Sequence, residues 1–266
     1  MPELPEVESV RRQLDVRLRG RLVRAVTVDP QARFGAVEKV TGHRIQGVGR
    51  RGKYLLAPLD GGLELVMHLG MTGSFRFRDA DRWHPDAYVR ATFELDDSVM
   101  DFRDVRRFGR LTVVTAGDYS GIATLDRLGP EPLSHDFDPA AFHRDLARSR
   151  MAVKPALLTQ RLVAGVGNIY ADEALWRARI NPRARRLSRV RTDRLWQAIR
   201  EVLAEAIERE GTTFRDYRMV NGQPGRNGDF LIAYGQAGRP CPRDGTPLRR
   251  IVLGGRGTTY CPRCQR

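Results

Sequence analysis

The first residues of the chain could carry nucleophilic chemistry. The chain begins MPELPE, so removal of Met1 would expose the secondary amine of Pro2 beside two carboxylates. An α-amino group titrates near about 7.7–8.0, so a large fraction is unprotonated at neutral pH without further tuning. Such an amine can attack a sugar aldehyde carbon to form an iminium, and Glu3 could shuttle the protons. The structural alternative is that the two prolines only start a helix, whose dipole the nearby glutamates favour.

Two turns near the C-terminus have the spacing of a zinc ribbon. Cys241-Pro-Arg-Asp244 is followed, after sixteen residues, by Cys261-Pro-Arg-Cys264. Each turn aims two ligands at one point, and a carboxylate oxygen is an acceptable though harder fourth ligand. We therefore predict one structural zinc ion at Cys241, Asp244, Cys261 and Cys264. Two alternatives stay open: a hairpin without metal, or three thiolates and a water with Asp244 turned away.

Two glycine-rich segments could hold phosphate. Residues 254–259 read GGRGTT and place Arg256 at the tip of a hairpin, where its guanidinium could grip an anion. Residues 165–168 read GVGN, a turn before a helix that begins near Asn168, and the N–H groups of such a turn attract phosphate. The alternatives are a solvated arginine and a helix that Asn168 caps without any ligand.

Composition points to a polyanionic partner. The 266 residues are 41% hydrophobic, enough to bury a core, and they carry a formal net charge of +14. That imbalance favours nucleic acid, although a biased genome could also supply arginines, because only three of the 46 basic residues are lysines. All three cysteines lie after position 240, so no disulfide framework is expected and a cytosolic chain is the default. No apolar run approaches the roughly 20 residues that a membrane span needs.

The first half of the chain reads as a helix followed by strands. Val7, Val10, Leu14 and Leu18 recur every three or four residues, which predicts an amphipathic helix that ends at Gly20. Short β-branched or alternating runs then predict an antiparallel sandwich or barrel. These runs are residues 22–28, 54–59, 63–69, 89–95 and 111–115, with turns at 60–62 and 96–97.

The second half reads as helical. After residues 128–132 (LGPEP) the strand signal fades, and apolar residues at helical spacing run from Leu195 to Ile207. Thr192 or Asp193 could cap that helix. Residues 211–238 are rich in Gly, Asn and Asp without periodicity, which predicts a long loop.

Five motifs together resemble the formamidopyrimidine-DNA glycosylases, also called 8-oxoguanine DNA glycosylases. The resemblance follows the chain in order and covers its whole length. The motifs are PELPE at 2–6, HLGMTG at 68–73, DVRRFG at 104–109, GVGNIYA at 165–171 and the terminal ribbon at 241–264.

The resemblance implies four catalytic roles. Pro2 would attack the deoxyribose C1′ as the Schiff-base nucleophile, and Glu3 would donate the proton. Lys53, in the segment RRGKYL, would contact phosphate and assist β-elimination. Arg256 would grip the phosphate at the lesion and assist δ-elimination.

A glycosylase takes its base out of the duplex, and the vacated stack must be filled. The resemblance assigns this role to Met71, Arg106 and Phe108, with Arg106 bonding to the orphaned cytosine. The loop 212–230 matches a lid that closes over the everted purine. Val105 replaces a proline that is common in relatives.

Further DNA contacts follow from the same resemblance. Asn168 would join the phosphate cluster, Glu6 would support the active site, and His68 would order this region. Tyr88 stands where many relatives have a DNA-contacting histidine, and Arg150 stands where they have a lysine.

We therefore predict an α+β enzyme of base excision repair. It has an N-terminal antiparallel β-sandwich with a leading helix (1–130), a helix-two-turn-helix domain with the lid (131–238) and a zinc-ribbon hairpin (239–266). It would bind double-stranded DNA with oxidised bases or abasic sites across the cleft between domains, as a monomer in the bacterial cytoplasm at the nucleoid. We expect zinc, but no redox or nucleotide cofactor. The rivals are an endonuclease VIII type enzyme for oxidised pyrimidines and a non-catalytic binder of damaged DNA.

Overall fold

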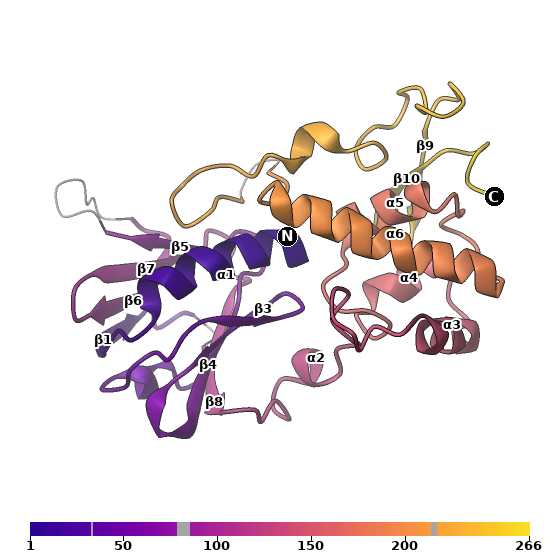
Figure 1. The fold of residues 1–266 in the computed structure, drawn as a ribbon. Helices are drawn as coiled ribbons and strands as arrows, with labels where there is room; N and C mark the ends of the chain where they lie inside the picture. The colour runs from indigo at the N-terminus through magenta and orange to yellow at the C-terminus, as the bar shows by residue number, and fades with distance from the viewer. Residues whose placement is uncertain (33, 79–85, 214–216) are drawn as a thin grey trace. The chain divides into compact units, whose positions relative to one another are not determined.

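The computed structural model describes residues 1–32, 34–78, 86–213 and 217–266. These residues form two compact units (Figure 1). The first unit comprises residues 1–126 and 210–226, and the second comprises residues 127–209 and 227–266. Within the described ranges, no helix is both long and apolar enough to span a membrane.

The first unit opens with helix α1 (Leu4–Leu18), as the periodicity predicts. Its apolar stripe of Val7, Val10, Leu14 and Leu18 is at most 2% exposed. Burying such a stripe stabilises a helix far more than its intrinsic propensity does. Because Pro5 lies in the first turn, where no intrahelical N–H bond is lost, it begins the helix without weakening it.

Two four-stranded antiparallel sheets form the rest of the first unit. One has the order β1-β6-β7-β5 and the other the order β2-β3-β4-β8. Their strands are β1 (Val23–Val28), β2 (Gly49–Arg51), β3 (Tyr54–Pro58), β4 (Leu63–His68), β5 (Ser74–Phe77), β6 (Val89–Leu95), β7 (Val99–Arg103) and β8 (Arg110–Thr115). Short helices η1 (Val37–Val40), η2 (Asp60–Gly62) and α2 (Ala123–Asp126) complete it. Residues from both sheets and α1 share one hydrophobic core, which confirms the predicted sandwich with its leading helix.

The second unit is helical and ends in a β-hairpin. Its elements are α3 (Pro139–Arg148), α4 (Val153–Leu158), α5 (Asn168–Arg177), α6 (Arg189–Glu208), η3 (Asn227–Phe230), β9 (Arg249–Leu253) and β10 (Arg256–Tyr260). The hairpin pairs β9 with β10 in antiparallel register.

The predicted cap of α6 is wrong. The N-cap is Ser188, and the helix therefore begins before the periodic apolar residues. Thr192 lies inside the first turns and donates its hydroxyl to the Ser188 carbonyl at 3.1 Å. Asp193 instead accepts from Arg189 one turn earlier, at 2.8 Å. Thr192 and Asp193 look like caps in the sequence because they shortly precede the periodic apolar residues that begin at Leu195.

Candidate active site and zinc centre

Two buried carboxylates lie at the start of α1, next to the buried Pro2. Glu3 is 3% exposed and Glu6 is 1% exposed. The two form a capping box, in which the backbone N–H of Glu3 donates to the Glu6 carboxylate at 2.7 Å. The N-terminal end of a helix dipole stabilises negative charge. The helix therefore fixes the position of Pro2 and holds the carboxyl group of the neighbouring Glu3 in place.

Glu6 also binds the beginning of the predicted lid. The backbone N–H of Thr212 donates to the second oxygen of Glu6 at 2.7 Å, and the Tyr217 hydroxyl donates to the Glu6 carbonyl at 3.2 Å. Gly211 has φ +80°, and a Cβ there would lie 2.7 Å from the Glu6 carboxylate. Lid residues 214–216 lie outside the described residues. Thr212 and Tyr217 of this loop are thus joined to α1.

Lys53 and His68 lie near each other in the first unit. Lys53 is buried, in the turn between β2 and β3. His68 ends β4, and its pKa is lowered to about 4, first by burial and then by the charges of Lys53 and Arg110. His68 is therefore neutral at physiological pH, and its Nδ1 accepts the Gly70 N–H at 3.1 Å. His68 thereby orders the turn that leads to Met71.

The structure brings the predicted wedge residues together. Met71 is half-buried, Arg106 is exposed and Phe108 is 48% exposed. The Arg106 guanidinium lies 4.8 Å from the centre of the Phe108 ring. The backbones of the two segments touch, since a Cβ on Gly70 would lie 2.5 Å from the carbonyl carbon of Phe108. The Phe108 ring and the Arg106 guanidinium therefore lie together at the surface, next to the exposed Val105.

Tyr88 and Arg150 occupy surface positions. Tyr88 is 43% exposed in the first unit, and the Arg103 guanidinium lies 4.8 Å from its ring centre. Arg150 is exposed in the second unit, and its carbonyl accepts from Arg185. Both side chains are available for contact with an external partner.

In the second unit, the glycine turn before α5 is held by Gln160. Its side chain accepts the Gly165 N–H at 2.8 Å and donates to the Val166 carbonyl. Gly167 is the N-cap, so the alternative in which Asn168 caps the helix is wrong. Asn168 is half-buried as the first helical residue, and its Oδ1 lacks a hydrogen-bond partner within the part of the chain that the structure describes.

A buried ion pair joins α5 to the strand of Arg256. Lys154 and Asp172 are at most 1% exposed and lie 2.7 Å apart. Lys154 donates to the carbonyl of Gly257 at 3.1 Å, and Asp172 accepts the Thr259 N–H at 2.9 Å. Arg256 is exposed at the first position of β10. Asn168 and Arg256 thus lie on neighbouring elements, α5 and β10, which the Lys154–Asp172 ion pair joins. No sequence motif indicated this pair; the only sign of it was that lysine is rare in the chain.

The four predicted zinc ligands converge on one point. Their ligand atoms all lie within 4.8 Å of one another. A tetrahedral zinc with Zn–S bonds of about 2.3 Å separates two sulfurs by about 3.8 Å, and a sulfur from a carboxylate oxygen by about 3.6 Å. Cys241 and Cys264 are 3.9 Å apart, and Cys261 lies 3.5 Å from Asp244. Asp244 therefore points toward the cluster, and the four residues fit one structural zinc ion.

The carboxylate should make this zinc site weaker than one with four cysteines. Asp244→Cys should slow zinc release to a chromogenic chelator by at least about tenfold, because thiolate is the softer ligand. Asp118→Cys adds a thiol on an exposed turn of the first unit and is the matched control. Equal release rates for Asp244→Cys and the unchanged protein would count against Asp244 as a ligand.

Models of known families match most of the chain. Residues 1–111 match the formamidopyrimidine-DNA glycosylase N-terminal domain, and residues 128–218 match the H2TH domain of the same enzymes. Residues 238–266 match a zinc finger found in FPG and IleRS.

Similar proteins and structures cover the full length. The formamidopyrimidine-DNA glycosylases of Thermus thermophilus and Deinococcus radiodurans are 49% and 44% identical; the alignments cover all of this chain and 98% and 97% of theirs. The crystal structure of the Thermus thermophilus enzyme has a TM-score of 0.92, over 99% of this chain and 98% of that one. A Lactococcus lactis variant in complex with Fapy-dG DNA is 36% identical, with a TM-score of 0.92 over all of both chains. The chain therefore belongs to the formamidopyrimidine-DNA glycosylase family.

Proposed function

We propose that this chain is a DNA glycosylase and abasic-site lyase of base excision repair that removes oxidised purines from duplex DNA. The observation that carries the proposal is the buried Pro2 at the start of α1, beside the buried carboxyl of Glu3. Removal of Met1 makes the Pro2 nitrogen a secondary amine. An amine next to a proton carrier can perform both steps of this chemistry.

The proposed reaction starts when the Pro2 nitrogen attacks C1′ of the damaged nucleotide. The bond to the base breaks, and Glu3 supplies the proton that the departing base takes up. The attacking nitrogen loses its proton, and the C1′–O4′ bond opens as the ring oxygen takes up a proton, which leaves an iminium at C1′. This iminium acidifies the C2′ hydrogen, so that β-elimination expels the 3′ phosphate. A second elimination then expels the 5′ phosphate, and hydrolysis of the remaining iminium frees the amine.

The other site residues would hold DNA. Lys53, Asn168 and Arg256 would bind phosphates around the lesion, and their positive or hydrogen-bonding groups suit that role. Tyr88 and Arg150 would add surface contacts. Glu6 and His68 would support the site by fixing Pro2 and the turn before Met71.

The charge of the chain supports duplex DNA as the partner. A net charge of +14 attracts phosphates and predicts binding that weakens steeply with salt. Relatives in solved structures hold DNA containing Fapy-dG or an abasic site. We infer that the enzyme works as a monomer and associates with the bacterial nucleoid.

The lesion preference tests the substrate class. Duplexes with 8-oxoguanine should be cleaved at least about tenfold more efficiently than duplexes with thymine glycol, because Leu4 in PELPE and the wedge residues, Met71 and Arg106 to Phe108, resemble those of the purine enzymes. Single-turnover rates on the two duplexes, with undamaged duplex as control, give the ratio. A preference for thymine glycol would identify an endonuclease VIII type activity instead, and binding without any cleavage would identify a damage-binding protein.

A further inference from the structure

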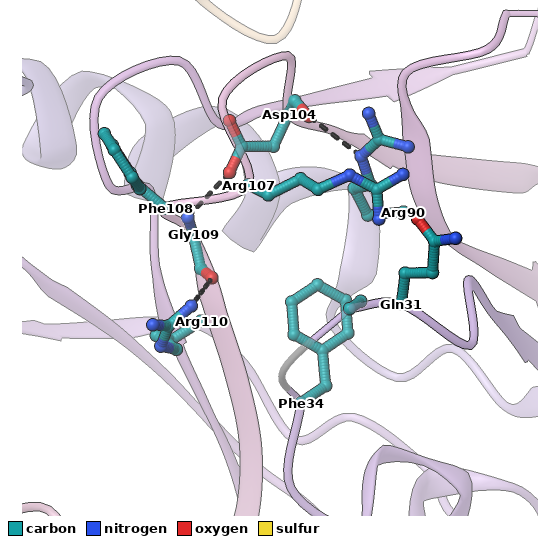
Figure 2. A pocket seen from close by; sticks show the side chains of 9 residues that line it. Gln31, Phe34, Arg90, Asp104, Arg107, Phe108, Gly109 and Arg110 are labelled. Atoms are coloured by element: carbon teal, nitrogen blue, oxygen red, sulfur yellow. Dashed lines mark hydrogen bonds between the residues drawn. The ribbon is translucent and has the colours of Figure 1, made fainter.

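A single buried carboxylate organises the loop that carries Arg106 and Phe108. Asp104 directly follows β7 and is 1% exposed. Its carboxylate accepts the Gly109 N–H at 2.6 Å and the Arg106 N–H at 3.2 Å. Figure 2 shows the link to Gly109 across the base of the loop. Asp104 thus binds both ends of the segment 106–109, which carries the side chains of Arg106 and Phe108.

The same carboxylate also holds the turn that carries Met71. The hydroxyl of Thr72 donates to Asp104 and accepts the Arg106 N–H at 3.1 Å. Together with the close backbone approach of Gly70 to Phe108, this hydroxyl joins the turn to the loop. All three wedge residues therefore belong to one hydrogen-bonded body centred on Asp104.

Backbone geometry in the loop needs this support. Arg107 has φ +57°, in the left-handed region that is strained for residues other than glycine. Its guanidinium and that of the buried Arg90 both bond to Asp29 at 2.9 Å, and Arg90 also donates to the Asp104 carbonyl at 2.9 Å. Figure 2 shows Arg90 and Arg107 beside Asp104. These bonds fix the loop in a conformation that it would not adopt alone.

Packing alone does not hold the loop. Arg107, Phe108 and Gly109 border a cavity of about 340 Å³, which Phe34 also lines. Because a cavity supplies few dispersion contacts on that side, polar bonds contribute to the position of the loop. The Asp104 carboxylate accepts two of the loop's N–H groups and the Thr72 hydroxyl.

We propose that Asp104 is a positioning residue for base eversion, which acts by holding Met71, Arg106 and Phe108 in one prearranged wedge. The inference rests on the proposed function. A wedge ordered in advance inserts into the duplex without an ordering cost, whereas a loosened wedge would slow the step that exposes the damaged base. A nucleotide that has already lost its base has less need of that step.

The test compares two substrates with the full-length protein. Asp104→Asn replaces one of the two carboxylate oxygens with an amide N–H₂, which then opposes either the Gly109 N–H or the Arg106 N–H and leaves donors unpaired in a buried site. The ratio of 8-oxoguanine excision to cleavage of a preformed abasic site should fall at least about tenfold. Asp101→Asn is the matched control, since Asp101 is buried on β7 but bonds to Arg78 and Thr92. It should lower the melting temperature without changing the ratio.

Two further variants keep the test decisive if Asp104→Asn folds poorly. Thr72→Val should lower the ratio of excision to abasic-site cleavage, and Thr72→Ser should restore it by returning the hydroxyl.

A double variant tests whether Asp104 acts through the wedge. In a Phe108→Ala background, Asp104→Asn should lower the ratio little further, because it acts through the wedge. An unchanged ratio, whether both rates stay the same or both fall equally, would overturn the inference. Failure of the unaltered protein to excise 8-oxoguanine would instead overturn the proposed function.

Discussion

Protein that retains Met1 in front of Pro2 will excise 8-oxoguanine at least about 10³-fold more slowly than protein that begins at Pro2. With Met1 in place, the Pro2 nitrogen is an amide, whose lone pair is delocalised and cannot attack C1′. The measurement is borohydride trapping of the protein on lesion-containing duplex, together with single-turnover excision. Intact mass establishes which form is present.

The control compares one protein preparation before and after its N-terminus is exposed. Protein made with a cleavable N-terminal extension should not be trapped before cleavage, and should be trapped once a protease exposes Pro2. Peptide mapping should place the crosslink at Pro2. Equal trapping of both forms, or a crosslink at the buried Lys53, would disprove the assignment of the nucleophile.

Glu3→Gln should reduce excision of 8-oxoguanine by about 10²- to 10⁴-fold, the usual range for loss of a general acid. An amide oxygen can still accept the backbone N–H in the capping box, so the start of α1 should persist. The amide cannot supply the proton that the departing base requires. Single-turnover rates on 8-oxoguanine duplex and on preformed abasic duplex measure the two steps separately.

Cleavage of the abasic duplex should fall much less in Glu3→Gln, since the base has already left. Glu64→Gln is the matched control, because Glu64 is also a buried glutamate, at the opposite end of β4 from His68, and accepts from Tyr119. It should leave both rates within about twofold of the unchanged protein. Equal losses on both substrates in Glu3→Gln would assign this glutamate to positioning.

Elements with a regular apolar pattern could be predicted from the sequence. Helix α1 has its stripe at every third or fourth residue, and β4 is a short, mostly apolar run, LELVMH, that directly follows the turn at 60–62. By contrast, β2 is the three residues Gly49–Arg51, and its apolar content is too low to suggest a strand. It is a strand because it pairs with β3 in tertiary structure, which no local pattern encodes.

The site could be predicted where a local motif carries it, and not where distant residues meet. The zinc ligands lie in two short turns, so their spacing alone indicated convergence. The bond from Thr212 to Glu6 joins residues 206 positions apart, and the bond from Thr72 to Asp104 spans 32. Neither residue type nor spacing marks such pairs. The resemblance placed Met71 with Arg106 and Phe108, but it said nothing of what holds them.

The two oxygens of Glu6 serve different segments, one at the beginning of the chain and one at Thr212. The loop after Gly211 and the N-terminal helix therefore cannot be replaced independently of each other. A chimera that imports residues 210–226 from a relative will function only if the donor loop keeps glycine at position 211 and a residue other than proline at 212, so that a backbone N–H can reach the host glutamate. Loop grafts intended to alter lesion preference should accordingly exchange both segments together.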